Sequence, residues 1–104
     1  MEFIGRKIGF DYDGTLSTSA IKEIAKKYVE RGDNVYIVSA RRYVSASMLS
    51  VARDLGIMIT RVHAVGSTQA KIDKVLELGL NIFYDNNPKV LSELRLKGIN
   101  TKKT

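Results

Sequence analysis

The chain has 104 residues, of which 44% are hydrophobic and 27% are charged. This length fits one domain, residues 1–104, and the composition is that of a folded protein rather than a disordered one. There is no cysteine, which excludes disulfides, thiolate metal sites and cysteine nucleophiles. The 17 Lys and Arg against 11 Asp and Glu give a net charge of +6, which favours phosphorylated or nucleic-acid partners.

The apolar stretches are too short to span a bilayer. The N-terminus passes through Arg6 and Lys7 instead of the long apolar region of a secretory signal. We therefore expect a cytoplasmic protein with no membrane partner.

Apolar runs alternate with helical patterns along the chain, which indicates an α/β protein with a mainly parallel sheet. The expected elements, in chain order, are a strand at 7–10, a helix at 17–31, a strand at 34–38, a helix at 44–55, a strand at 61–65, a helix at 68–78, a strand at 81–84, a helix at 89–97 and a short strand from Ile99. Gly32, Gly56 and Gly79 follow three of the helical stripes, where glycine commonly ends a helix. Residues 101–104 are polar and are expected to fray.

An acid pair, Asp11 and Asp13, comes at the end of the first apolar run and is followed by Gly14 and Thr15. Residues two apart on a strand point the same way, so the two carboxylates can converge on one ligand if the chain turns between them. Such an arrangement suits a phosphate and a hard cation.

Three further polar residues stand at positions that place them near the acid pair in a parallel sheet. Ser39 and Asp85 each come at the end of a predicted strand, and Lys71 lies near the start of the helix that precedes Asp85. Ligands of open parallel sheets bind beyond the carboxyl ends of the strands. We therefore expect these side chains to share a site with the acid pair, with Lys74 as the alternative to Lys71.

In this order, the acid pair with its Gly-Thr, the serine, the lysine and the last acid resemble the four motifs of the haloacid dehalogenase-like phosphohydrolase superfamily. The resemblance covers essentially the whole chain, and its first motif is the specific one. It implies a Rossmann-like three-layer sandwich with four to five mainly parallel strands in the order 5-4-1-2-3. Because no inserted segment separates the motifs, a member without a cap domain is expected.

The resemblance also implies roles. Asp11 is the expected nucleophile, which forms an aspartyl-phosphate, and Asp13 is the expected general acid and base. Mg²⁺ would neutralise charge on ligands from Asp11, Asp13 through its carbonyl, Asp85 and Asn86 through a bound water.

The expected phosphate-binding groups lie on later segments. Ser39, the backbone amide of Ala40 and Lys71 would hold the phosphoryl oxygens, on which charge spreads during transfer. Arg41, at the rim, would grip a second phosphate of the substrate or a nucleotide backbone, because guanidinium geometry matches phosphate.

Two departures from the family pattern keep alternatives open. The fourth motif reads Asp85-Asn86-Asn87-Pro88 with one acid, which predicts weaker Mg²⁺ binding and leaves open a non-catalytic phosphate or nucleic-acid binding module. The absence of a cap insertion predicts an open site, suited to a polynucleotide end or to a cap supplied by a second subunit of a homo-oligomer. The leading expectation is an Mg²⁺-dependent phosphomonoester hydrolase, with a polynucleotide end phosphatase as an alternative.

Overall fold

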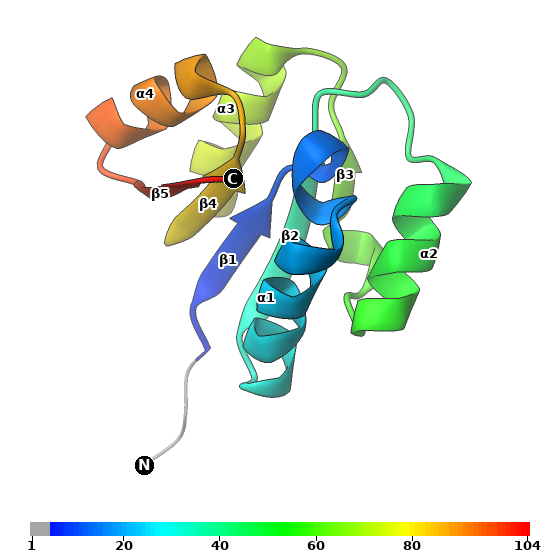
Figure 1. Cartoon of the computed structure of the whole chain (residues 1–104). Coiled ribbons are helices and arrows are strands. Elements are labelled where there is room, and N and C mark those ends of the chain that lie inside the picture. Colours follow the sequence, from blue (N-terminus) through cyan, green and yellow to red (C-terminus); the bar gives the residue numbers. More distant parts are fainter. Residues whose placement is uncertain (1–4) are drawn as a thin grey trace.

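Five strands form one sheet in which every neighbouring pair is parallel, in the order β3-β2-β1-β4-β5. The computed structural model describes residues 5–104, and Figure 1 shows the strands at its centre. The strands are β1 (Lys7–Phe10), β2 (Asn34–Ser39), β3 (Val62–Ala64), β4 (Ile82–Asp85) and β5 (Asn100–Lys103). The predicted strand order is the same order read from the other edge, so the fold prediction is confirmed.

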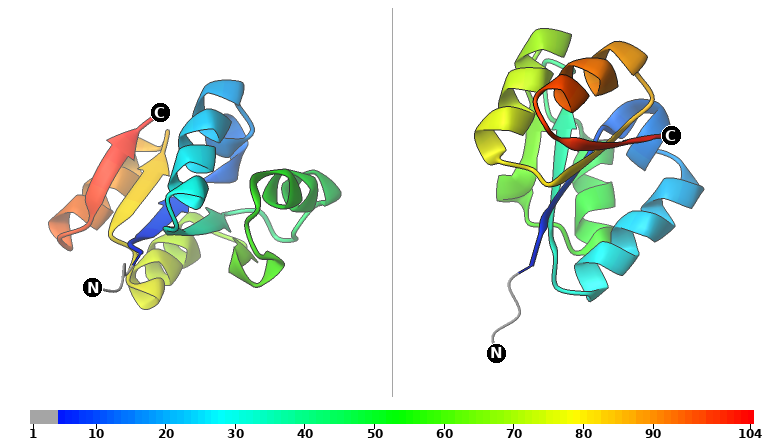
Figure 2. Two further views of the ribbon diagram at one scale, coloured as in Figure 1. Left: turned by 90° about the horizontal axis from the view of Figure 1, so that it is seen from below. Right: turned by 90° about the vertical axis from the view of Figure 1, so that its left-hand side faces the viewer.

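Helices cover both faces of the sheet (Figure 2). One face carries α1 (Ser19–Glu30) and α2 (Ala46–Leu55), and the other carries α3 (Thr68–Leu78) and α4 (Pro88–Leu96). Two single turns, η1 (Tyr12–Leu16) and η2 (Ile59–Arg61), join strands to helices. No helix in residues 5–104 is long and apolar enough to cross a membrane.

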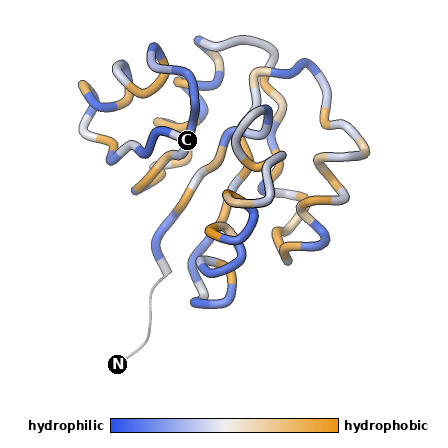
Figure 3. The backbone as a smooth tube through the Cα atoms, viewed as in Figure 1, coloured by the Kyte–Doolittle hydropathy of each residue, from blue (hydrophilic) through white to orange (hydrophobic). Residues whose placement is uncertain are grey.

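The alternation of side chains along the strands divides the core into two layers. Phe10, Ile37 and Tyr84 are buried with α1 and α2, whereas Val38 and Phe83 are buried with α3 and α4. Figure 3 shows that the inner strands are largely apolar. A strand covered on both faces needs apolar residues on both, which explains the nearly continuous apolar runs of β2 and β4.

Gly9 shows how closely the layers pack. A side chain at this position would collide with Leu80 and Phe83. The missing side chain of Gly9 therefore leaves room for Leu80 and Phe83, which belong to the core layer under α3 and α4.

Two helices begin later than their sequence patterns predict. α1 begins at Ser19 instead of residue 17 because residues 12–16 form η1, in which Gly14 has a φ of 69°. α2 begins at Ala46 because the side chain of Ser45 accepts a hydrogen bond from the N–H of Met48 and caps the helix.

The expectation that residues 101–104 fray is wrong. Thr101, Lys102 and Lys103 pair with β4 as part of β5, and the N–H of Thr104 donates to the carbonyl of Asp85 at 3.1 Å. Backbone pairing at an edge strand does not require apolar side chains, and lysine is common there. A polar sequence alone therefore did not show that this segment is ordered.

Candidate active site

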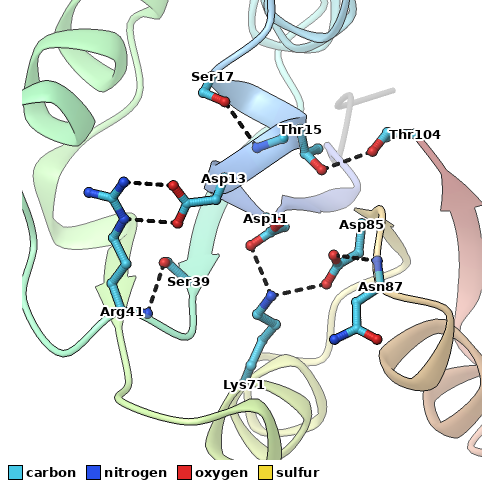
Figure 4. A network of polar contacts seen from close by, with 11 residues as sticks. Asp11, Asp13, Thr15, Ser17, Ser39, Arg41, Lys71, Asp85, Asn87 and Thr104 are labelled. Atoms are coloured by element: carbon cyan, nitrogen blue, oxygen red, sulfur yellow. Dashed lines mark hydrogen bonds and ion pairs between the residues drawn. The ribbon is translucent and has the colours of Figure 1, made fainter.

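The carboxyl ends of the inner strands bring the predicted site residues to one edge of the sheet. Asp11 directly follows β1, Ser39 is the last residue of β2, and Asp85 is the last residue of β4. Lys71 lies in the first turns of α3, which begins after its cap residue Ser67. Figure 4 shows these side chains gathered in one network.

Lys71 joins the two buried acids of this network. Its Nζ donates to Oδ1 of Asp11 at 2.9 Å and to Oδ2 of Asp85 at 3.1 Å. The side chains of Lys71 and Asp11 are 6% exposed and that of Asp85 is fully buried. The remaining oxygen of Asp85 accepts from the N–H of Asn87 at 3.0 Å. Two carboxylates and one ammonium give the cluster a net charge of −1.

Burial governs the protonation of this cluster. It raises the pKa of Asp11 to about 6, with a further upward contribution from the charge of Asp85, while the hydrogen bond and charge of Lys71 act in the opposite direction. Burial lowers the pKa of Lys71, but its hydrogen bonds and charge interactions with the two carboxylates outweigh burial and leave that pKa raised. At neutral pH, Asp11 is therefore mainly ionised and Lys71 is charged.

The loop that contains the two acids of the first motif turns directly after them, at Gly14. A side chain at Gly14 would collide with the amide of Asn86, and the positive φ of 69° also favours glycine. The N–H of Gly14 donates to Oγ of Ser17 at 3.0 Å. The loop therefore packs directly against the fourth-motif segment, and the exposed Asn86 lies beside it.

Asp13 faces away from the buried cluster. Its two carboxylate oxygens accept hydrogen bonds from Nε of Arg41 at 2.8 Å and from Nη2 of Arg41 at 2.6 Å. The hydrogen bond from Arg41 lowers the pKa of Asp13. The sequence placed both residues in the site but did not predict that they pair; the only signal was that Arg41 stands two residues after a strand end at the same edge.

Three more residues that the sequence assigned to the site are Ser39, Ala40 and Lys74. Ser39 is buried, and its Oγ accepts from the N–H of Arg41 at 3.1 Å, while Ala40 connects the two and is half-buried. Lys74 is turned to Glu77, with Nζ 3.2 Å from Oε2. The structure thus brings Lys71, and not Lys74, to the acids.

Two contacts of the site were not predicted from the sequence. Oγ1 of Thr15 lies 2.9 Å from Oγ1 of Thr104, so the end of β5 braces the first-motif loop. The ring of Tyr12 is buried beneath the guanidinium of Arg41, whose central carbon lies 5.3 Å from the ring centroid. Tertiary packing alone creates both contacts.

The acids of the site offer oxygen ligands, which Mg²⁺ prefers, and Mg²⁺ usually keeps several waters. Asp11 and Asp85 supply two carboxylates that lie close enough to share one lysine nitrogen. Residues 5–104 contain no group of three His, Cys, Asp or Glu side chains that could hold a metal ion. The oxygen chemistry fits a site in which two carboxylates are supplemented by backbone carbonyls and water.

No family model and no curated protein matches the chain. Among solved structures, it is similar to a hypothetical protein from Xanthomonas campestris, with a TM-score of 0.55 and 23% identity over 92% of this chain. The aligned region covers 62% of that protein, so this chain spans less than two thirds of its length. The likeness shows the fold alone.

Proposed function

We propose that this protein is an Mg²⁺-dependent phosphomonoester hydrolase of the haloacid dehalogenase-like superfamily that works through an aspartyl-phosphate on Asp11. The observation that carries the proposal is the bridge from Lys71 to both Asp11 and Asp85 at the carboxyl edge of the sheet. Two buried carboxylates beside a lysine suit phosphoryl transfer, in which catalysis consists mainly of positioning and charge stabilisation.

In the first step, the oxygen of Asp11 that does not accept from Lys71 attacks phosphorus while the bond from phosphorus to the ester oxygen breaks. Asp13 has to leave Arg41 and take up a proton from solvent before the departing oxygen can take that proton from it. Lys71 and the hydroxyl of Ser39 stabilise the negative charge that spreads over the phosphoryl oxygens. The oxygen of Asp11 that accepts from Lys71 stays fixed, which orients its partner for attack.

In the second step, water attacks the phosphorus of the aspartyl-phosphate and Asp13 takes up its proton. The bond from phosphorus to Asp11 breaks, which releases inorganic phosphate and restores the carboxylate of Asp11 and the acid form of Asp13. Asp13 therefore acts first as an acid and then as a base.

Asp11, Asp85, the backbone carbonyl of Asp13 and, through water, Asn86 are the residues proposed to hold Mg²⁺. The bound ion would neutralise the repulsion between the nucleophile and the phosphate. With one acid in the fourth motif, we expect weaker binding than a site with two acids would have.

A polynucleotide end phosphatase is the second candidate, and the open approach to the site favours it. Only η1 and α1 lie between β1 and β2, and only α2, η2 and β3 lie between Ser39 and α3. The exposed Tyr43, at 79%, stands in the loop after β2, where a base could stack on it. We also propose that a second copy of the chain covers this edge of the sheet. A cytoplasmic location is part of the same proposal.

The experiment is a phosphatase screen of the wild type and Asp11→Asn across sugar phosphates, nucleotides and oligonucleotides with 3′- or 5′-phosphates. We expect Mg²⁺-dependent phosphate release by the wild type and a loss of about 10³-fold or more in Asp11→Asn. Asp54→Asn, an exposed acid on α2, is the matched control and should retain activity. Circular dichroism confirms that each variant is folded.

Release of phosphate by Asp11→Asn at the wild-type rate would contradict the proposal that Asp11 forms an aspartyl-phosphate. If the wild type hydrolyses no phosphoester with Mg²⁺, Mn²⁺ or Co²⁺, the proposal that the protein is a phosphatase is wrong. Salt-sensitive oligonucleotide binding without hydrolysis would instead support a non-catalytic binding module.

A further inference from the structure

The site contains an exposed ion pair beside its buried one. Nε of Arg41 donates to one oxygen of Asp13 at 2.8 Å, and Nη2 donates to the other at 2.6 Å. The side chain of Arg41 is 41% exposed and that of Asp13 is 55% exposed. Solvent, and a ligand dissolved in it, can therefore reach both partners of this pair.

The pair holds Asp13 in an arrangement that hydrolysis cannot use. Both oxygens of its carboxylate accept from Arg41, and Figure 4 shows the side chain turned from Asp11 toward the loop after β2. A proton donor has to come within hydrogen-bond reach of the departing oxygen. A ligand that competes with Asp13 for the guanidinium would therefore assist the proposed reaction.

A phosphate group is a suitable competitor for the guanidinium of Arg41. Exposed ion pairs contribute little to stability, because water solvates both partners when they separate. Phosphate offers the guanidinium the same two-oxygen geometry as a carboxylate, and it carries up to two negative charges instead of one. A substrate phosphate can therefore replace Asp13 on Arg41.

Contacts that do not involve Asp13 hold Arg41 in place. Its N–H donates to Oγ of Ser39 at 3.1 Å, and its carbonyl accepts from the N–H of Gly66 at 2.9 Å. Its guanidinium carbon lies 5.3 Å from the ring centroid of the buried Tyr12. These contacts can persist after Asp13 leaves, and a donor that is already oriented binds with a smaller loss of entropy.

The phosphate at Arg41 would be a different group from the one that is transferred. In Figure 4 the carboxylate of Asp13 stands between the guanidinium and Asp11. Lys71 contacts Asp11 directly, so the transferred phosphoryl group is expected beside Lys71. A substrate that also reaches Arg41 needs a second phosphate.

We propose that Arg41 is a binding site for a second phosphate of the substrate, and that Asp13 occupies this site until such a substrate displaces it. This inference rests on the proposed function and concerns its substrate class. A nucleoside bisphosphate and the phosphorylated end of a polynucleotide share the required chemistry. No covalent bond changes in the exchange: Arg41 passes from one anion to another, and Asp13 becomes free to turn toward the departing oxygen.

The first test measures phosphate release with Mg²⁺ from thymidine 5′-monophosphate, thymidine 3′,5′-bisphosphate and a 5′-phosphorylated oligothymidylate. We expect wild-type kcat/KM to be about tenfold or more higher for at least one substrate with a second phosphate than for the monophosphate. Arg41→Met should lower this ratio to about twofold or less. It should also raise kcat/KM for the monophosphate about two- to fivefold, because Asp13 no longer has to leave a partner.

Arg53→Met, which removes an exposed arginine of α2, controls for the loss of one positive charge and should keep the wild-type ratio. An equal fall of kcat/KM for all three substrates in Arg41→Met would overturn the inference. Preference for the bisphosphate and preference for the oligonucleotide both support it, and they distinguish the two sources of the second phosphate.

The second test measures binding in Asp11→Asn, where the proposed reaction cannot proceed. In protein labelled with ¹⁵N, we expect the Nε–Hε resonance of Arg41 to shift with thymidine 3′,5′-bisphosphate and to shift much less with the monophosphate. Adding Asp13→Asn should raise the ratio of bisphosphate to monophosphate affinity, measured by calorimetry, about three- to tenfold, because the competing carboxylate is gone. Adding Asp54→Asn instead, which removes an exposed acid of α2, should leave this ratio unchanged.

An Arg41 resonance that does not respond to the bisphosphate would overturn the inference, as would an unchanged affinity ratio after Asp13→Asn. If the wild type hydrolyses no phosphoester, the proposed function is wrong, and the binding test still decides whether Arg41 takes a second phosphate. Turnover that needs Asp11 but has the same substrate ratio in wild type and Arg41→Met overturns only the role of Arg41.

Discussion

At the scale of single residues, Lys71 is the cation that faces two buried carboxylates. It is buried with Asp11 and Asp85 and donates to both. Charges that are buried without a partner are costly, so the removal of one partner of a buried pair is strongly destabilising. Lys71 therefore stabilises the fold in addition to its proposed role toward phosphate.

Lys71→Met should lower the free energy of unfolding by about 3–5 kcal/mol at pH 8, because two buried carboxylates lose their cation. The loss should be smaller at pH 5, where protonation of Asp11 relieves the repulsion. Urea denaturation at both pH values measures it. Lys74→Met, which removes the ion pair with the exposed Glu77, should cost less than about 1 kcal/mol. Equal losses for both lysines would contradict the prediction.

The wild type should also lose stability as the pH rises from about 4 to about 6. The pKa of Asp11 is about 6 in the folded state and about 3.9 in an unfolded chain, so the folded state binds the proton more tightly in this window. The stabilisation is present in full below about pH 4 and is lost as the pH rises through 6. Thermal unfolding across this range measures the change, and Asp11→Asn should flatten it.

At the scale of elements, three strands and one helix each bring one chemical group to the site. An acid directly follows β1, β2 ends on a hydroxyl, β4 ends on an acid, and α3 supplies the lysine. The elements themselves were predictable because burial on one or both faces leaves a periodic pattern in the sequence. Their ends were less predictable where a cap or a turn intervened, as at Ser45 and Gly14.

The packing of α4 provides a test at this scale. Leu94 is fully buried against α3 and the sheet, whereas Leu96, two residues further on, is 82% exposed. Leu94→Ala should cost about 2–5 kcal/mol of unfolding free energy because it leaves a cavity. Leu96→Ala should change it by less than about 0.5 kcal/mol. Urea denaturation distinguishes the two, and similar costs would show that α4 packs differently from the arrangement described.

At the scale of the whole molecule, a basic protein of net charge +6 presents a site that no inserted element covers within residues 5–104. A polyanionic substrate would be attracted over a longer range than a small phosphate, and salt would screen that attraction. From 50 to 200 mM NaCl we expect kcat/KM to fall about tenfold or more for a phosphorylated oligonucleotide and about twofold for a mononucleotide. Equal falls would argue against the polynucleotide candidate.

The sequence by itself determined the α/β class, the strand order and the residues of the first motif, because these follow from local periodicity and from a resemblance carried by short motifs. That Asp11, Ser39, Lys71 and Asp85 form one site was a prediction, and the structure brings their side chains to one edge. The catalytic roles assigned to them stay predictions. The grouping of these residues could be predicted from the sequence because parallel strands end at a common edge of the sheet.

Only the tertiary structure decided which side chains meet. It placed Lys71 on Asp11 across 60 positions, Arg41 on Asp13 across 28 and Thr104 on Thr15 across 89. Lys71 and Lys74 are equivalent in sequence terms, and the polar residues 101–104 carry no apolar signal. Their partners depend on how distant elements pack, and such contacts leave no periodic pattern in the sequence.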